Sequence, residues 1–210
     1  MAEFLATLDP KTAEQIEYLI DNVPFAIWET LYSTVLATLL AYLIGLPLGV
    51  ILVVGEKGGV LPLPKPVMTF LNVAVNLLRS VPFLILMVVV FPLSRVLIGT
   101  SIGTPASIVP LFIAAFPFVA RLVESSLREM DRGVIEAAQA MGCSPFQIIT
   151  KVILPECVPS LLTGFATAFV TILSYGAMSG AIGGGGLGAM ALNRGYTRHQ
   201  NIVLWGAVIL

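Results

Sequence analysis

The stretch EAAQAMGCSPFQIITKVILPE, residues 136–156, is a polar, proline-interrupted segment between two strongly apolar runs of the chain. The whole chain has 210 residues, of which 57% are hydrophobic and only 11% are charged. Soluble domains carry about 25% charged residues, so this chain lacks the charge that usually covers a water-exposed surface. The composition therefore indicates a polytopic membrane protein in which residues 136–156 form a hydrated segment between spans.

Apolar runs that are long enough to cross a membrane recur along the chain. A helix needs about 20 mostly apolar residues to cross the hydrocarbon layer. Candidate spans cover residues 31–54, about 67–93, 106–120 with an extension past 121, and about 160–182. A fifth apolar segment, 202–210, would rise only about 13–14 Å as a helix, which is too short to cross. The sequence therefore predicts an all-α membrane helix bundle with about five transmembrane helices, the last one incomplete.

The N-terminal residues differ from the rest in being rich in acidic side chains. Residues 1–22 contain no basic n-region, so they are not predicted to be a signal peptide. Apolar residues at positions 16, 19, 20 and 23 recur at helical spacing and predict a short interfacial helix before the first span. We therefore divide the chain into an N-terminal interfacial segment, 1–26, and a transmembrane domain, 27–210.

The distribution of lysine and arginine predicts the orientation, because short cytoplasmic loops carry an excess of both. One set of loops carries Lys57, Lys65, Arg121, Arg128, Arg132 and Lys151, and the opposite set carries Lys11, Arg95, Arg194 and Arg198. This bias predicts a cytoplasmic loop at 121–159 and an N-terminus outside the cell. The net charge of −1 gives no indication of nucleic-acid binding, and the two cysteines match no metal-binding or redox motif.

Local physical chemistry predicts two short helices with a sharp turn inside the quoted stretch. Alanines favour continuation of a helix from Glu136, and Gly142 permits a left-handed turn. Ser144 is a good N-cap and Pro145 suits the first position of a second helix, which Pro155 and Pro159 are expected to end. That helix places four apolar residues on one side: Phe146, Ile149, Ile153 and Leu154. Such a helix either docks on another protein or rests on lipid headgroups.

The same stretch resembles the signature of permease subunits of binding-protein-dependent ABC importers. That signature reads E-A-A, three residues, G, nine residues, then I-x-L-P, and Val152 stands here where isoleucine is usual. The resemblance implies that residues 144–154 form a coupling helix that seats in a groove of an ATPase subunit. The residues it assigns to coupling are Glu136, Ala137, Ala138, Gly142, Ser144, Pro145, Phe146, Ile149, Val152, Leu154 and Pro155. We also expect Glu136 to help hold the elbow through an arginine of the ATPase.

A longer resemblance, to the methionine importer permease family, begins at Trp28. It is carried by WETL, GLPLGV, NLLRSVPFLIL, FPLSRVLIGTSIG, IVPL, PFVARLVESSL and SYGAMSGAIGGGGLG, in that order. It implies the type I ABC importer permease fold in a bacterial inner membrane. It also implies a homodimer with two ATPase subunits, which bind ATP and Mg, and a periplasmic or lipid-anchored substrate-binding protein. The chain itself contains no P-loop pattern, so no ATP hydrolysis or cofactor of its own is expected.

Two polar stripes are candidates for the translocation pathway. Asn72, Asn76 and Arg79 share one helical face, which either lines the pathway or dimer seam or clamps the bundle. The second stripe consists of Thr163, Thr167, Thr171, Ser174 and Met178 and suits either a solute pathway or helix packing.

Near the outward end of the second stripe, the resemblance suggests a periplasmic constriction that includes Tyr175, Met178 and Ser179. The glycines at 183–186 are expected to let the adjoining loop move.

The alternatives are a permease for another amino acid or small polar solute, a secondary active transporter, and an intramembrane hydrolase. A secondary transporter usually shows internal symmetry and an intramembrane carboxylate, and neither is evident in residues 31–54 and 160–182. A hydrolase would need Ser179 to be activated by His199, the only histidine, which falls in a hydrated loop.

Overall fold

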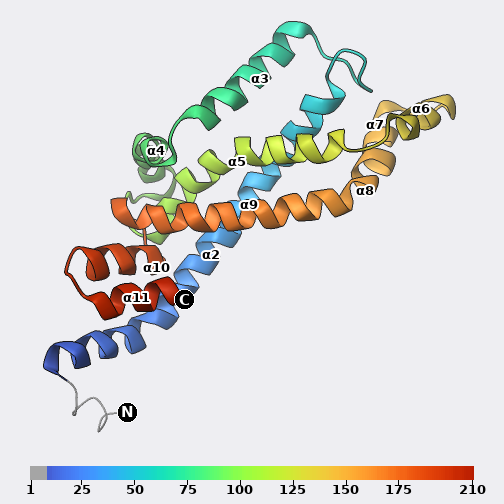
Figure 1. Ribbon diagram of the computed structural model, residues 1–210. Coiled ribbons are helices and arrows are strands. Elements are labelled where there is room, and N and C mark those ends of the chain that lie inside the picture. The colour runs from blue at the N-terminus through green and yellow to red at the C-terminus, as the bar shows by residue number, and fades with distance from the viewer. Residues whose placement is uncertain (1–8) are drawn as a thin grey trace. The chain divides into compact units, whose positions relative to one another are not determined.

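The computed structural model describes residues 9–210, and within that range every regular element is a helix (Figure 1). The long helices are α2 (Pro10–Val54), α3 (Lys65–Ser80), α4 (Phe83–Ile98), α5 (Thr104–Arg128) and α9 (Val158–Ser179). The short ones are α6 (Arg132–Ala140), α7 (Pro145–Ile148), a π-helix (Ile149–Ile153), α8 (Leu154–Glu156), a 3-10 turn (Gly180–Ile182), α10 (Gly186–Ala189), a second π-helix (Met190–Tyr196) and α11 (Asn201–Ile209). The first eight residues of the predicted N-terminal segment lie outside the described residues.

The apolar helices confirm the prediction of an all-α membrane protein. Three segments are individually long and apolar enough to cross a membrane: α2, α5 and the run Val158–Ile182. Helices α3 and α4 reach that length only as a pair with a break between them. Helix α11 has nine residues, as the length of the last apolar segment indicated.

The predicted interfacial helix and the first span are continuous in the structure, because α2 is one helix of 45 residues. Pro24 lies inside it, where a proline removes one hydrogen bond of the helix but need not end it. Apolar packing continues across this position, since Ala26 is buried against Met190 and Val203. That packing keeps the chain helical where the local sequence alone predicts a boundary.

The second predicted span, about 67–93, also differs from the structure, because it consists of two helices rather than one. Helix α3 ends at Ser80, and α4 begins at Phe83. Val81 between them is extended, with φ −78° and ψ 127°. The residue before a proline avoids the helical region for steric reasons, so Pro82 forces a full break here rather than a bend.

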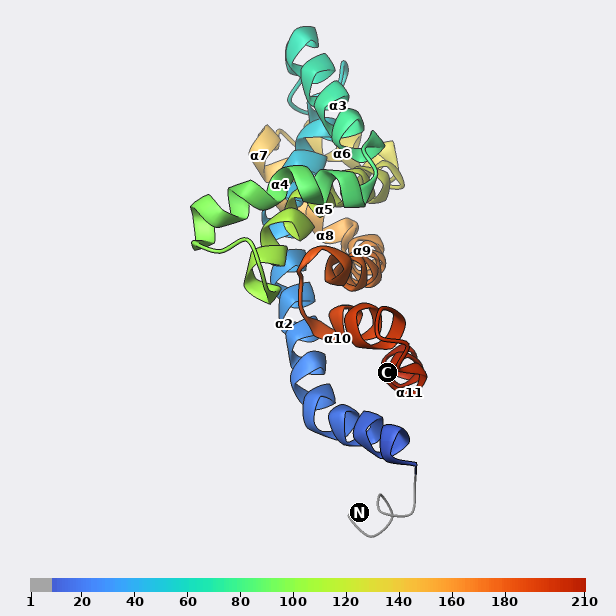
Figure 2. The same ribbon diagram turned by 90° about the vertical axis from the view of Figure 1, so that its left-hand side faces the viewer.

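The helices form two compact units, which we describe separately. The first consists of the chain up to Ala37, Phe83–Leu111 and Thr171–Leu210, and the second consists of Thr38–Pro82 and Phe112–Val170. In the first unit, Met87 and Phe91 of α4 are buried against Ala106. Figure 2 shows α10 and α11 of this unit close to the N-terminal half of α2. In the second unit, Leu52 of α2 is buried against Met68 and Val75 of α3.

Two glycines of α2 permit a close approach of α5 within the second unit. A methyl group on Gly49 would lie 2.6 Å from the Ala120 carbonyl oxygen and 2.7 Å from Val123 Cβ. One on Gly45 would lie 2.7 Å from Val119 Cγ1. Small residues let membrane helices pack backbone to backbone, so this contact fixes the separation of the two helices.

We therefore expect Gly49→Ala to destabilise the protein by about 1–3 kcal/mol, the usual cost of overpacking a close contact. The matched control is Gly164→Ala in α9, because a methyl group there would be 3.7 Å from its nearest neighbour, an ordinary contact. Thermal unfolding in detergent measures both variants. Equal melting temperatures for the two would contradict the close-approach interpretation.

Candidate coupling surface and transport face

The predicted elbow at residues 136–156 forms a rigid cap on the second unit. Asp131 caps α6 by accepting a hydrogen bond from the Gly133 N–H at 2.8 Å. Gly142 then has φ +79°, a left-handed conformation that favours glycine. Next, Ser144 and Gln147 form a reciprocal capping box at the start of α7, with the Ser144 N–H donating to Gln147 Oε1 at 2.8 Å. The predicted glycine turn and serine N-cap are confirmed, whereas the role of Asp131 was not predicted.

The apolar residues of this elbow divide into a buried set and an exposed set. Ile148 and Ile153 are buried, and α6 contacts both α7 and the π-helix that follows it. Phe146 is 74% exposed, and Met141 is exposed as well. The prediction that Phe146 and Ile153 share one side of the helix was wrong, because Phe146 is exposed and Ile153 is buried. The π-helix at Ile149–Ile153 has wider turns than an α-helix and so shifts the phase between the two residues.

The sequence predicted that Pro155 would help to end the helix, but the helix continues past this residue. Pro155 lies in the first turn of α8, where a proline loses no hydrogen bond that the helix needs. The break comes at Cys157, whose N–H still donates to the Ile153 carbonyl oxygen at 3.1 Å. The remaining coupling residues named by the sequence lie along this continuous path. Ala138 is buried, Val152 and Leu154 are half-buried, and Glu136, Ala137 and Pro145 are exposed.

The two cysteines of the elbow differ in accessibility. Cys143 is half-buried, whereas Cys157 is buried. Burial raises the pKa of the Cys157 thiol, and the neighbouring carboxylates of Glu156 and Glu129 raise it further. Cys157 is therefore protonated at neutral pH and a poor nucleophile, so Cys143 is the thiol expected to react with maleimides.

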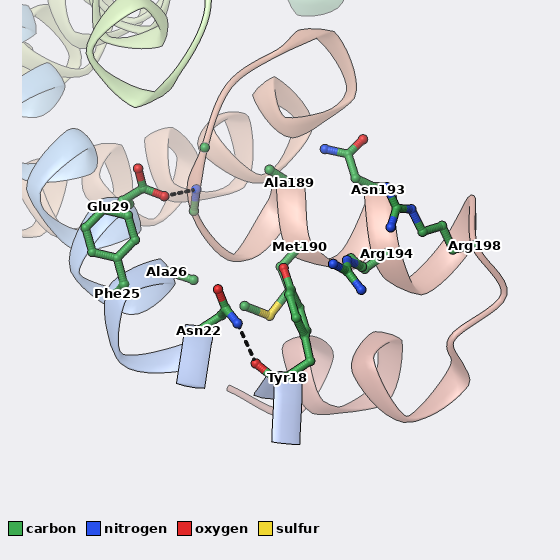
Figure 3. A pocket seen from close by; sticks show the side chains of 12 residues that line it. Tyr18, Asn22, Phe25, Ala26, Glu29, Ala189, Met190, Asn193, Arg194 and Arg198 are labelled. Atoms are coloured by element: carbon green, nitrogen blue, oxygen red, sulfur yellow. Dashed lines mark hydrogen bonds between the residues drawn. The ribbon is translucent and has the colours of Figure 1, made fainter. Parts of the chain in front are cut away.

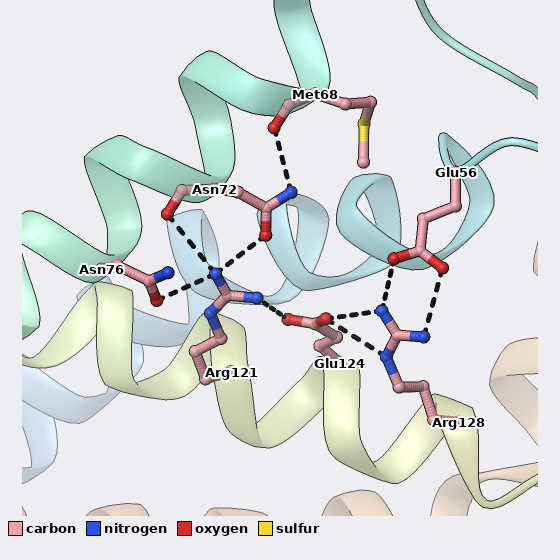
Figure 4. A network of polar contacts seen from close by, with 7 residues as sticks. All are labelled: Glu56, Met68, Asn72, Asn76, Arg121, Glu124 and Arg128. Atoms are coloured by element: carbon pink, nitrogen blue, oxygen red, sulfur yellow. Dashed lines mark hydrogen bonds and ion pairs between the residues drawn. The ribbon is translucent and has the colours of Figure 1, made fainter. Parts of the chain in front are cut away.

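A polar network connects α5 to α3 and to the loop after α2 (Figure 4). Arg121 of α5 donates to Asn72 Oδ1 at 2.9 Å and to Asn76 Oδ1 at 3.0 Å. It also pairs with Glu124, whose side chain is 10% exposed. Arg128 binds the other oxygen of Glu124 at 2.8 Å and makes two hydrogen bonds to Glu56. Every charge in this network has a partner, as charges near lipid require.

This network changes the interpretation of the first polar stripe. The oxygens of Asn72 and Asn76 are occupied by Arg121, so the two asparagines clamp α3 to α5. Arg79, the third residue of that stripe, is exposed. A clamp through Arg79 was one of the sequence-based interpretations of this stripe, whereas the role of Arg121 was not predicted. Within α3, Lys65 and Thr69 extend the same polar face toward its N-terminus.

The second polar stripe lies on the least buried of the apolar spans. Of the most apolar part of the span Val158–Ile182, only 11% is buried inside the protein, whereas the corresponding share for α5 is 61%. Thr163 and Thr167 are exposed, and their hydroxyls donate to the carbonyl oxygens of Pro159 and Thr163. Threonine hydroxyls bonded in this way add a weakly polar surface without leaving donors unpaired in lipid.

The C-terminal part of the stripe, from Thr171 onward, belongs to the first unit. Thr171 is half-buried, and Ser174 and Met178 are exposed. The Tyr175 ring stacks on Phe83 with ring centroids 4.3 Å apart. Ser179 is buried and donates to the Gly176 carbonyl oxygen at 2.7 Å, whereas His199 is exposed. No hydrogen bond in residues 9–210 joins Ser179 to His199, so the geometry does not support a hydrolase.

The glycine-rich loop of the first unit is bound by Glu29 and Thr30, and Thr104 in turn donates to Glu29. None of these three residues was predicted from the sequence. Glu29 accepts hydrogen bonds from Thr104 Oγ1 at 2.6 Å and from the Gly186 N–H at 2.9 Å. Thr30 Oγ1 accepts one from the Leu187 N–H at 2.9 Å. A methyl group on Gly185 would lie 1.8 Å from Thr104 Oγ1. Gly185 therefore permits the close approach of the loop backbone to Thr104.

Glu29 also lines a pocket of about 290 Å³ beside this loop (Figure 3). Phe25 and Met190 provide apolar walls, and Arg194 and Arg198 lie at the side of the pocket opposite Glu29. The Arg194 guanidinium stacks on the Tyr18 ring at 4.2 Å from its centroid. The pocket thus combines charges of both signs with apolar surface.

We expect Glu29→Gln to weaken the hold on the loop, because an amide offers one acceptor oxygen where the carboxylate offers two. Hydrogen bonds to charged groups contribute about 1.5–3 kcal/mol, so exchange of the Gly186 amide hydrogen should accelerate about tenfold or more. Hydrogen–deuterium exchange measures this, with Glu17→Gln, an exposed carboxylate of α2, as control. Unchanged exchange at Gly186 would show that Glu29 does not hold the loop.

Comparisons with known proteins place these features in a family. The family described as "Binding-protein-dependent transport system inner membrane component" matches residues 45–210. The probable D-methionine transport system permease protein MetI of Vibrio cholerae is 47% identical over 185 residues, which are 88% of this chain and 82% of that protein. The D-methionine transport system permease protein MetI of Escherichia coli K12 is 45% identical over 154 residues, 73% of this chain and 70% of that protein.

A solved structure gives the same result for the fold. A chain of the MetNI methionine ABC transporter in an inward-facing conformation superposes with a TM-score of 0.89 at 40% sequence identity. The alignment covers 92% of this chain and 89% of that one. The chain described here therefore belongs to the inner membrane permease family of binding-protein-dependent ABC importers, in the group that contains the D-methionine permeases.

Proposed function

We propose that this chain forms the membrane pathway of an ATP-driven importer for methionine. It works as a homodimer with two ATPase subunits, which bind ATP and Mg, and with a periplasmic or lipid-anchored substrate-binding protein. The names of its relatives support the substrate, since both MetI proteins are described as D-methionine permeases. The N-terminus lies outside the cell, and the elbow at 136–156 lies in the cytoplasm.

The exposed aromatic residue on the capped elbow is the observation that carries this proposal. Phe146 projects from a short helix whose start is fixed by Ser144 and Gln147 and whose other side is buried. An exposed aromatic residue on a rigid support is the usual anchor of a protein interface. Glu136 is exposed nearby and forms no ion pair in the part of the chain that the structure describes. We assign it to a cation of the ATPase.

Motion of the elbow reaches the membrane through α5 and the polar network. ATP binding draws the two ATPases together, and the elbows move with them. Because α6 follows α5 after three residues, the elbow pulls directly on the end of α5 that carries Arg121 and Arg128. Those arginines hold α3 and the loop after α2, so the second unit moves as one body. The bundle then opens alternately to the two sides of the membrane.

The weakly polar stripe of α9 suits the pathway itself. Because little of this span is buried, its surface can contact a second copy of the chain. Threonine hydroxyls bind a zwitterion only weakly, which suits a solute that must be released again. Tyr175 and Met178 form the outer constriction, where a thioether offers an adaptable apolar surface. The pocket beside Glu29 belongs to the same unit as this constriction, and we assign it to docking of the substrate-binding protein.

The central test compares two exposed aromatic residues, Phe146 and Tyr196, which are 74% and 70% exposed. Phe146→Ala should reduce co-purification of the ATPase about 30-fold, because interface anchors contribute about 2 kcal/mol or more. Tyr196→Ala should leave it unchanged. The ATPase should also protect Cys143 from maleimide labelling in the unaltered complex. Wild-type recovery of ATPase with Phe146→Ala would overturn the coupling proposal.

Substrate and energy source need a separate measurement in vesicles. Uptake of labelled methionine should require ATP and continue when the proton gradient is collapsed. Competition by other amino acids should be weak if methionine is the substrate. Uptake that follows the proton gradient without ATP would instead favour a secondary transporter.

The polar network gives a further prediction for the double variant Asn72→Ala/Asn76→Ala. This variant removes the side-chain contacts of α3 with Arg121 of α5 but leaves the Arg121–Glu124 pair intact. Two hydrogen bonds to a charged group are lost, each of which contributes about 1.5–3 kcal/mol, so α3 loses its hold on α5 and the methionine transported per ATP should fall. ATP hydrolysis should persist. Asn201→Ala, at an exposed asparagine of α11, is the control. A change confined to the KM for methionine would instead place Asn72 and Asn76 in the pathway.

A further inference from the structure

A second pocket of about 560 Å³ lies in the second unit, where α2 ends and α3 begins. Its wall includes Lys57 from the connecting loop and Lys65 and Thr69 from α3. The apolar run of α2 ends at Val54, and α3 begins at Lys65, so the pocket lies at a boundary of the membrane. The proposed transport function does not require a pocket at this position.

The charge in this pocket is positive. Lys57 and Lys65 are both exposed, and neither forms an ion pair within residues 9–210. Glu56 also lines the pocket, but its carboxylate is bound by Arg128 through two hydrogen bonds. Two lysines therefore face the pocket without a compensating acidic group, and Thr69 adds a hydroxyl donor beside them.

An apolar surface continues from one edge of the pocket along α3. Val73 lines the pocket and is exposed, and Phe70 and Leu77 extend this exposed apolar face toward the middle of the membrane. Leu77 lies 12 positions after Lys65, which corresponds to a rise of about 18 Å along a helix. Half of the hydrocarbon layer is about 15 Å thick. The distance from the lysines to Leu77 thus matches the length of one acyl chain.

The network of Figure 4 fixes the back wall of the pocket. Asn72 and Asn76 line it, and their side-chain oxygens are held by Arg121 of α5. Asn72 Nδ2 also donates to the Met68 carbonyl oxygen at 2.9 Å. The wall is therefore formed before any ligand arrives, which lowers the entropic cost of binding.

We propose that this pocket binds an anionic glycerophospholipid. The phosphate group lies between Lys57 and Lys65, with Thr69 as a hydrogen-bond donor, and an acyl chain lies along Val73 and Leu77. Basic residues next to membrane helices attract anionic headgroups in this way. The bound lipid would fix α3 against the loop after α2, the two elements that the network already joins to α5.

The test uses the permease purified with its ATPase in detergent that contains phosphatidylglycerol or phosphatidylcholine, and native mass spectrometry counts the retained lipids. Phosphatidylglycerol should be retained in preference to phosphatidylcholine. Lys57→Gln and Lys65→Gln should each weaken its binding about fivefold, and the double variant about 25-fold. Lys57→Arg/Lys65→Arg should retain the lipid, as should the charge control Lys11→Gln.

Three results would overturn the proposal. The first is equal retention of phosphatidylglycerol by the double glutamine variant and the unaltered complex. The second is displacement of the lipid by soluble glycerol phosphate, which would indicate a site for free anions. The third is disulfide formation between two copies carrying Val73→Cys, which would show that a second copy covers this face. Co-purification of the ATPase with the double variant checks that its loss of lipid is separate from any failure of coupling.

Discussion

One nearly buried carboxylate, Glu124, organises the end of the membrane domain that leads to the elbow. Its two oxygens bind Arg121 and Arg128, which in turn hold α3 and the loop after α2. Removing one partner of a buried ion pair costs about 3–5 kcal/mol, because the remaining charge is left without compensation. The polar contacts of α5 with α3 and with the loop after α2 therefore depend on the pairing of these three residues of α5.

The elbow gains its rigidity from different interactions. Capping by Asp131, the turn at Gly142 and the reciprocal bonds of Ser144 and Gln147 satisfy backbone groups that a short helix would leave unpaired. A helix as short as α7 is unstable on its own, so these caps and the burial of Ile148 hold it in place. A rigid elbow can transmit force, whereas a flexible one would absorb it.

In the first unit, the glycine-rich loop also needs partners for its backbone groups. Membrane proteins must pair the backbone groups of irregular segments, and here Glu29 and Thr30 accept from the Gly186 and Leu187 N–H groups, while Thr104 donates to the Glu29 carboxylate. The glycines bring the backbone near enough to accept these partners. These contacts join the loop to the start of the first span.

Sequence patterns predicted the features that depend on neighbouring residues. The all-α apolar character, the glycine turn and the serine cap follow from hydropathy and from local conformational preferences, and they were predicted correctly, whereas the break inside the second span at Pro82 was not. Pairings between distant residues left no periodic signal, so Arg121 with Asn72 and Glu29 with Gly186 were missed. The uninterrupted α2 was also missed, because burial of Ala26 against Met190 and Val203 outweighs the local effect of Pro24. The stretch WETL, which contains Glu29 and Thr30, was used only as part of the family resemblance. A single carboxylate at the start of an apolar run indicates a specific hydrogen-bond donor, and this signal could have identified Glu29.

The central claim is that the elbow and α3 move together as parts of one body. Spin labels at Met141 of the elbow and Ser80 of α3, both exposed, would test it by double electron–electron resonance, with Cys143 and Cys157 replaced by serine. We predict the same distance distribution between the labels in the nucleotide-free and the ATP-trapped complex. A distance that shifts with nucleotide in the otherwise unaltered complex would contradict the claim, because the elbow would then move without carrying α3.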